Sequence, residues 1–176
     1  MAESMISYRK LVNSELHTEY FSSFKHEQNW NRQWVNSNGS WSLQPRKHSR
    51  SWSPEKRIWI SQYIKEQINN GGFALGAFDD DKIVGFICVN GTIIEACANL
   101  TMLFVDDGYK RNGIGRNLFE RAKKEALLLG AKKLFISAIP SEETISFYFS
   151  VGCEDAKNII SNFVDTETDR YLEISL

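Results

Sequence analysis

An apolar run that leads through a glycine-containing turn into an amphipathic segment constrains this fold most. Leu100–Val105 is apolar apart from one threonine and predicts a buried strand. After the turn at 106–112, apolar residues recur with helical spacing at Ile114, Leu118, Phe119, Ala122 and Ala126. We therefore expect a helix over Gly113–Leu129, with Gly130 at its C-terminal stop. A strand that feeds a crossover helix is typical of α/β and mixed α+β domains.

Weaker patterns on both sides extend this unit to a mixed sheet flanked by helices. Short apolar or alternating runs predict further strands at Ile6–Leu11, Phe73–Phe78, Ile83–Val89, Lys133–Ala138, Asn158–Val164 and Arg170–Ile174. Capping residues and prolines predict helices within Glu15–Trp34, from Pro54 to about Asn69, and from Ser141 to about Ser150. The acidic turn at 79–82 joins two of these strands as an antiparallel hairpin.

Composition narrows the function classes. A chain of 176 residues that is 42% hydrophobic can bury one substantial core, so we expect residues 1–176 to form one domain. Its 21 basic and 22 acidic residues give a net charge of −1, with no global attraction to nucleic acid or to an anionic membrane. Cys88, Cys97 and Cys153 lack the spacing of a zinc site, so no metal is expected. Without a signal-peptide core or a membrane-length apolar stretch, we expect a cytoplasmic protein.

The turn before the 113–129 helix has the properties of a phosphate-binding loop. Free N–H groups and the positive end of the helix dipole meet at a helix N-terminus, and Gly113 and Gly115 let an anion approach the backbone closely. Lys110, Arg111 and Arg116 add positive charge. The alternative is that the glycines only make a tight turn and the basic side chains are solvated. Neither standard nucleotide-binding glycine motif is present.

Two segments at a consistent separation resemble one enzyme family. Lys110–Gly115 resembles the acetyl-CoA signature of the GNAT family of N-acetyltransferases, in which Arg or Gln is followed at the third position by Gly and at the fifth by Gly or Ala. Lys110 departs from the usual Arg or Gln and lacks the planar fork of arginine. Ser141–Cys153 is similar to the family segment Asn-x-x-Ala-x-x-Phe-Tyr-x-x-x-Gly-Phe, with Phe147, Tyr148 and Gly152 in register.

This resemblance implies a fold and a binding mode. The fold would be a mixed, largely antiparallel sheet of about six to seven strands with about four helices and a splay between the central strands. The pyrophosphate of the co-substrate acetyl-CoA would bind the loop and helix start, made of Lys110, Arg111, Asn112, Gly113, Ile114, Gly115 and Arg116. Its pantetheine arm would pair with the strand residues Leu103, Phe104 and Val105.

The resemblance also implies the chemistry. An acceptor amine would attack the thioester directly in a ternary complex, a backbone N–H would stabilise the oxyanion, and Tyr148 would protonate the departing thiolate. Some family members carry a glutamate base at the position of Asn99. Glu95, four residues earlier, is a weak candidate to replace it, and a water chain is the alternative. A non-catalytic acyl-CoA-binding or sensing module is the rival function.

Acceptor recognition stays open at the level of sequence. A small-molecule amine and a peptide amine both fit the resemblance, as do acetyl and longer acyl donors, and a homodimer is compatible with it. The N-terminal half holds all five tryptophans and a basic cluster between Arg46 and Arg57. Most of these tryptophans either belong to the core, with a solvated basic loop, or form an aromatic acceptor pocket. The loop is also a candidate to hold the CoA 3′-phosphate.

Overall fold

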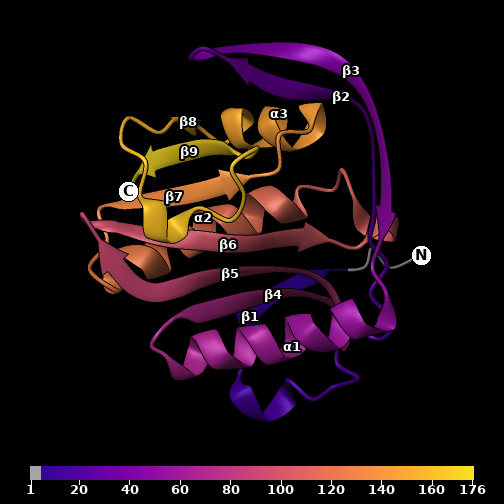
Figure 1. Ribbon diagram of the computed structural model, residues 1–176. Helices are drawn as coiled ribbons and strands as arrows, with labels where there is room; N and C mark the ends of the chain where they lie inside the picture. Colours follow the sequence, from indigo (N-terminus) through magenta and orange to yellow (C-terminus); the bar gives the residue numbers. More distant parts are fainter. Residues whose placement is uncertain (1–4) are drawn as a thin grey trace.

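The computed structural model describes residues 5–176 as one seven-stranded sheet, a separate two-stranded ribbon and three α-helices (Figure 1). The strands are β1 Ile6–Lys10, β2 Glu27–Ser37, β3 Ser40–Ser51, β4 Phe73–Asp79, β5 Lys82–Ile94, β6 Cys97–Val105, β7 Lys133–Ala138, β8 Glu154–Asp155 and β9 Arg170–Ser175. The helices are α1 Pro54–Asn69, α2 Ile114–Leu128 and α3 Glu142–Ser150. None of the helices within residues 5–176 has the length and apolar character needed to cross a membrane.

The sheet confirms the expected topology, including the splay at its centre. Its strand order is β1-β4-β5-β6-β7-β9-β8, and every neighbouring pair is antiparallel except β6 and β7. These two parallel strands pair only at Cys97, Ala98 and Asn99, against Lys133, Leu134 and Phe135. Beyond Asn99 the strands diverge, so their C-terminal ends form the two arms of a V.

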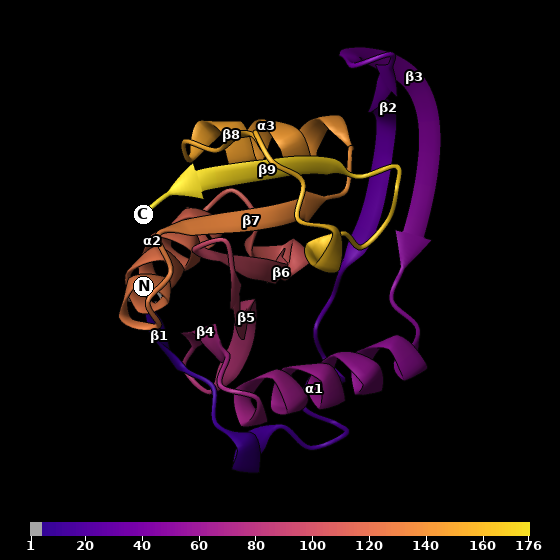
Figure 2. The same ribbon diagram turned by 60° about the vertical axis from the view of Figure 1, so that its left-hand side comes forward.

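Helices cover both faces of the sheet (Figure 2). Apolar residues of α2 and α3 join the largest core cluster on one face, with Leu118, Phe119 and Ile145 almost fully buried. On the other face, Ile60 and Ile64 of α1 belong to a second cluster with Phe86 and Met102. The alternation of side chains along β6 explains this division, since Leu103 and Val105 pack in the first cluster and Phe104 in the second.

The N-terminal region differs most from the sequence-based expectation. The predicted helix within Glu15–Trp34 is wrong, because residues 27–37 form β2, which pairs with β3 in a long ribbon. Asn38 and Gly39 connect the two strands, and both have positive φ, of 52° and 84°. That geometry is typical of the type I′ turn, for which Asn-Gly is the preferred sequence. The basic segment from Arg46 to Arg57 is therefore not a loop: its first part lies in β3, and Lys56 and Arg57 lie in the first turn of α1.

The ribbon is attached to the sheet at both arms of the V. At the β6 end, the Lys25 carbonyl accepts a hydrogen bond from the Asp107 N–H at 2.8 Å, and the Lys25 N–H donates to Asp106 Oδ2 at 2.9 Å. At the β7 end, the Trp34 N–H donates to the Pro140 carbonyl at 2.7 Å, and Arg32 forms an ion pair with Glu142. The chain between these contacts spans the open end of the V.

An arginine of β9 holds the distal part of the ribbon. The guanidinium of Arg170 lies 4.8 Å from the ring centroids of both Trp34 and Trp41 and 5.0 Å from that of Phe149. Its Nε and Nη2 donate to the two carboxylate oxygens of Asp155, at 2.7 and 2.9 Å. This aromatic cage fixes the ribbon above α3 and β9.

Three further expectations need correction. Asn158–Val164 is not a strand: Ile160 and Phe163, three residues apart, are buried beside Phe135, and Ser161–Phe163 forms a single 3₁₀ turn. The described chain has three α-helices where about four were expected. Only one of the five tryptophans, Trp52 at 5% exposure, belongs to the buried core, so the expectation that most of them do is wrong.

Candidate functional site

A cavity of about 710 Å³ occupies the V between β6 and β7. Most of the predicted binding and catalytic residues line it, namely Leu103, Phe104, Val105, Lys110, Arg111, Gly113, Ile114, Gly115, Arg116 and Tyr148. The cavity thus brings together the strand, the glycine turn and the tyrosine that the two motifs single out. Its lining includes residues from both faces of the sheet, so it passes between the diverging strands.

The backbone of β6 presents hydrogen-bonding groups to this cavity. The Asp106 N–H donates to the Val84 carbonyl of β5 at 2.8 Å. Because alternate residues of a strand direct their backbone groups to the same side, Phe104 also faces β5, whereas Leu103 and Val105 face the V. No β7 residue pairs with β6 beyond Asn99 within the described chain. The N–H and C=O groups of Leu103 and Val105 therefore offer a strand-like edge to a bound molecule.

The N-terminus of α2 supplies donors at the other end of the cavity. The first intrahelical hydrogen bond runs from the Asn117 N–H to the Gly113 carbonyl at 3.0 Å, so the N–H groups of residues 114–116 have no partner within the helix. Gly113 has φ of +76°, and Arg111 has φ of +65°, a conformation that costs a non-glycine residue about 1 kcal/mol or more. This strained turn directs successive N–H groups toward an anion.

Two of the three basic side chains of the turn, Lys110 and Arg116, are already engaged with neighbours. Lys110 Nζ forms an ion pair with Asp107 at 2.7 Å, and Arg116 Nη2 donates to the Ser150 carbonyl at 3.3 Å. Asn112 donates to the Tyr109 carbonyl at 3.2 Å and does not line the cavity. The backbone of the turn is therefore better placed for anion binding than these side chains.

Tyr148 lies in the cavity wall on α3. Its side chain is 6% exposed and packs edge-to-face against Phe119 and Phe147, with centroid separations of 6.2 and 5.3 Å. Burial, with a smaller contribution from Cys153, raises the pKa of Tyr148 well above its usual value. The phenol is neutral at physiological pH even at the usual tyrosine pKa, and burial stabilises this protonated form further.

The structure separates the weak candidate base from this site. Glu95 is exposed in the turn between β5 and β6, with φ of +51°, and does not line the cavity. Glu95 and Leu103 are eight positions apart, which corresponds to roughly 25 Å along an extended strand. Asn99 is buried where β6 pairs with β7 and does not line the cavity either. Residues 5–176 contain no group of three or more His, Cys, Asp or Glu side chains placed to bind a metal ion.

Sequence reasoning missed one wall of the cavity. Residues His26 to Trp30 line it where the ribbon crosses the V, together with Thr101 of β6 and Ser137 of β7. Thr101 has no partner in β5, because the adjacent residues Cys88 and Val89 pair with Met102 and Leu100. This extra residue in β6 is a β-bulge. Four of the five residues in His26–Trp30 are polar, so the sequence shows no apolar alternation that would reveal a strand here.

The sequence and the fold both match known acetyltransferases. Residues 52–162, more than half of the chain, match the family model described as an acetyltransferase (GNAT) domain. No curated protein matches the sequence significantly.

Solved structures extend the match over nearly the whole chain. A protein from Bacillus anthracis assigned as a streptothricin acetyltransferase, in complex with acetyl coenzyme A, has a TM-score of 0.73 and 16% identity, covering 98% of this chain and 100% of its own. PaiA N-acetyltransferase from Thermoplasma acidophilum, bound to coenzyme A, has a TM-score of 0.61 and 21% identity, with 98% and 99% covered.

A third solved structure has a protein acceptor. The ribosomal-protein-S18-alanine N-acetyltransferase from Escherichia coli has a TM-score of 0.57 and 19% identity, covering 96% of this chain and 90% of its own. At these identities the structural likeness establishes the fold, while the family model establishes the lineage. The chain belongs to the GNAT family and is an acetyltransferase.

Proposed function

We propose that residues 1–176 form one catalytic domain that transfers the acetyl group of acetyl-CoA to a primary amine in a ternary complex. The observation that carries this proposal is the convergence of three features on one cavity: the strand-like edge at Leu103 and Val105, the N-terminus of α2, and Tyr148. A cytoplasmic location accompanies the proposal. The acceptor is a small-molecule or peptide amine, because the structural neighbours include proteins named for both kinds.

The donor fits the cavity by the chemistry of its walls. The N–H groups at residues 111–116 suit the pyrophosphate, and Gly113 leaves open space there, with only Asn117 within 4 Å of a built Cβ. The free backbone groups of Leu103 and Val105 suit the amides of a pantetheine arm. A backbone N–H on this edge would donate to the thioester carbonyl oxygen and stabilise the oxyanion as the amine attacks.

The proposed reaction needs one proton donor and one proton acceptor. The amine nitrogen forms a bond to the carbonyl carbon, and the carbon–sulfur bond breaks. Tyr148 gives its phenolic proton to the thiolate, while the amine proton passes to water and from the solvent back to Tyr148. No covalent enzyme intermediate is required, and the buried cysteines are poor nucleophiles, since burial raises the pKa of Cys88 to about 12.

Calorimetric titration with acetyl-CoA and with CoA tests the donor site. We compare the natural protein with Gly113→Trp, which places an indole at the α2 N-terminus. The matched control is Gly39→Trp, because Gly39 also has positive φ and open space around it but lies in the ribbon turn, away from the cavity. Both variants carry similar backbone strain, so a difference between them reports on the cavity.

We expect saturable binding by the natural protein and by Gly39→Trp, and loss of binding by Gly113→Trp. Absence of binding by the natural protein would refute the proposed function. An amine screen with Tyr148→Phe then separates an enzyme from an acyl-CoA-sensing module, since a sensor would bind the donor and acetylate no amine.

A further inference from the structure

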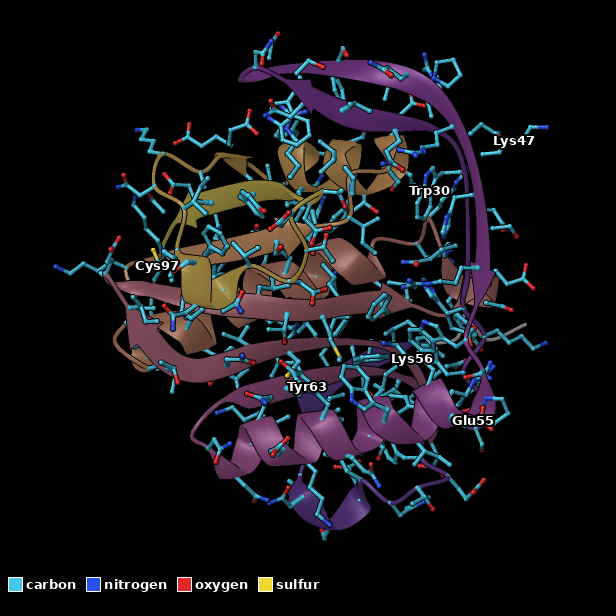
Figure 3. All side chains as sticks on the ribbon, viewed as in Figure 1. Trp30, Lys47, Glu55, Lys56, Tyr63 and Cys97 are labelled. Carbon is cyan, nitrogen blue, oxygen red and sulfur yellow. The ribbon has the colours of Figure 1, made fainter. Side chains whose placement is uncertain are left out.

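Three alternate side chains of the segment that crosses the V form a row on the cavity wall. All of residues 26–30 contribute to the cavity lining, but only His26, Gln28 and Trp30 are buried or half-buried, whereas residues 27, 29 and 31 are exposed. The segment is held to the end of β6 by hydrogen bonds at Lys25 and to the start of α3 by Trp34. Trp30 lies on the inner side of the ribbon (Figure 3). The row is therefore a fixed wall, not part of a mobile loop.

Two members of this row have buried polar atoms without partners. His26 is 7% exposed, yet neither of its ring nitrogens makes a hydrogen bond with any of residues 5–176. The Oε1 atom of Gln28 is likewise buried and unpaired within the described chain. Buried polar groups in folded proteins are nearly always satisfied, so groups left unpaired beside a cavity indicate a missing partner.

The imidazole lies on the opposite side of the V from Tyr148. His26 packs on Trp52 and Phe104, with ring centroids 4.7 and 4.8 Å away, and both belong to or contact the α1-side cluster. Tyr148 belongs to the core on the α2 side. The backbone of Val105 lies close enough to the His26 ring to raise its pKa, although the contact does not have the geometry of a hydrogen bond. A molecule that enters the cavity from the α1 side would therefore contact His26. This histidine lies next to the backbone edge of Leu103 and Val105, where we propose that the thioester binds.

The side chains of the row carry no charge, although Glu27 of the same segment also contributes to the cavity lining. Burial, with a smaller effect of the nearby Lys110, lowers the pKa of His26 to about 4, so the ring is neutral at physiological pH. A neutral imidazole offers one acceptor and one donor, and Gln28 adds an amide oxygen as acceptor. Trp30 provides an aromatic surface that is supported by His48, stacked at 4.0 Å.

From these contacts we propose that His26 and Gln28 bind the acceptor amine, and that Trp30 contacts a flat apolar group that carries it. The preferred acceptor is then a primary amine on an aromatic scaffold, because a polyamine has no flat apolar group for Trp30 to contact. This inference rests on the proposed function, because it assigns the acceptor half of the same cavity. His26 acts as an acceptor-binding residue that orients the nitrogen lone pair toward the carbonyl carbon.

Acetylation of 2-phenylethylamine and of spermidine, followed by release of CoA, tests the assignment. The variants are His26→Leu, which removes both nitrogens, and His26→Gln, which retains a donor and an acceptor. His17→Gln is the matched control, since His17 is an exposed histidine outside the cavity. Acetyl-CoA binding and thermal unfolding of each variant are measured in parallel.

We expect the natural protein to prefer 2-phenylethylamine. In His26→Leu, kcat/KM for this amine should fall by about 10- to 100-fold, with partial recovery in His26→Gln and no change in His17→Gln. Acetyl-CoA affinity should stay within about twofold, and His26→Leu should melt no lower than the natural protein, because it removes an unpaired buried group. A merely structural histidine would instead lower the melting temperature and leave the kcat/KM of the folded variant unchanged.

Several results would overturn the inference. One is a preference for spermidine or the acetylation of neither probe by a protein that binds acetyl-CoA. Another is unchanged turnover in His26→Leu, and a third is a parallel loss of acetyl-CoA affinity, which would place His26 in the donor site. If the natural protein binds no acetyl-CoA, the proposed function itself fails, which the calorimetric titration distinguishes.

Discussion

Replacing Arg170 with methionine should release the distal part of the ribbon without unfolding the sheet. Arg170 is 8% exposed in its side chain and holds Trp34 and Trp41 through their ring faces. Methionine keeps a side chain of similar length in the aromatic cage but removes the charge and the hydrogen bonds to Asp155. The ribbon would then be held mainly by its backbone contacts near Pro140 and Asp107.

The size of the effect follows from the contacts that are lost. Each cation–π contact at 4.8 to 5.0 Å contributes about 0.5–1 kcal/mol, and contributions that share one guanidinium do not add fully. The side chain of Asp155 is 50% exposed, so the ion pair contributes at most about 1 kcal/mol. We therefore expect a loss of about 2 kcal/mol, which corresponds to roughly 30-fold more frequent opening.

Native-state hydrogen exchange measures this opening at one amide. The Trp34 N–H is bonded to Pro140, so its exchange in Arg170→Met should accelerate about 30-fold while amides of β5 keep their protection. Arg32→Gln is the control. It removes the ion pair with Glu142, whose two side chains are 54% and 40% exposed, so the exchange rate at Trp34 should change by less than about threefold. Unchanged exchange at Trp34, or equal acceleration in β5, would refute the role given to the cage.

Three further predictions concern catalysis and acid stability. Tyr148→Phe should lower kcat by about 100-fold with acetyl-CoA affinity unchanged in calorimetry, because only the proton donor is lost. The pKa of His26 is about 4 in the folded protein and 6.5 in the free side chain, so only the unfolded state binds a proton here between these two values. The free energy of unfolding should therefore decline as pH falls from 6.5 to 4, and His26→Gln should lack this decline in urea unfolding. Burial opposes ionisation of Glu15, but hydrogen bonds from Arg9 and the Val12 N–H outweigh it and lower its pKa from 4.5 to about 2. The full shift corresponds to about 3 kcal/mol, and solvent screening of this partly exposed pair reduces it, so Glu15→Gln should be about 1–2 kcal/mol less stable at neutral pH. The difference should vanish in urea unfolding as pH falls from 4.5 toward 2.

The parts of the fold that sequence predicted well are those whose local signals agree with the packing. The helix α1 begins where Ser53 accepts a hydrogen bond from the Lys56 N–H, as its N-cap position and Pro54 indicated. The five apolar positions predicted for α2 are all buried, and β7 has the predicted bounds. The glycine turn and Tyr148 line one cavity because the strand–turn–helix unit and α3 pack on the same face.

The parts that sequence predicted poorly depend on contacts between distant residues. Polar residues dominate β2 and mask its alternation, and the Asn38-Gly39 turn signal was outweighed by a capping serine upstream. The cavity wall at His26 is formed only when the ribbon reaches Asp107 and Pro140, about 80 and 110 positions away in the chain. No local pattern encodes such a meeting, so this wall of the cavity cannot be read from the sequence.

The short pairing of β6 with β7 has a consequence for how the protein unfolds. Within residues 5–176, β6 of the four-stranded half, β1-β4-β5-β6, pairs in register with β7 of the three-stranded half, β7-β9-β8, at only three positions. The largest apolar cluster spans the junction instead, joining Val84 and Leu100 of one half to Leu134 and Leu172 of the other beneath α2. Cooperative unfolding of the two halves therefore depends on side-chain packing against this helix rather than on the continuity of the sheet.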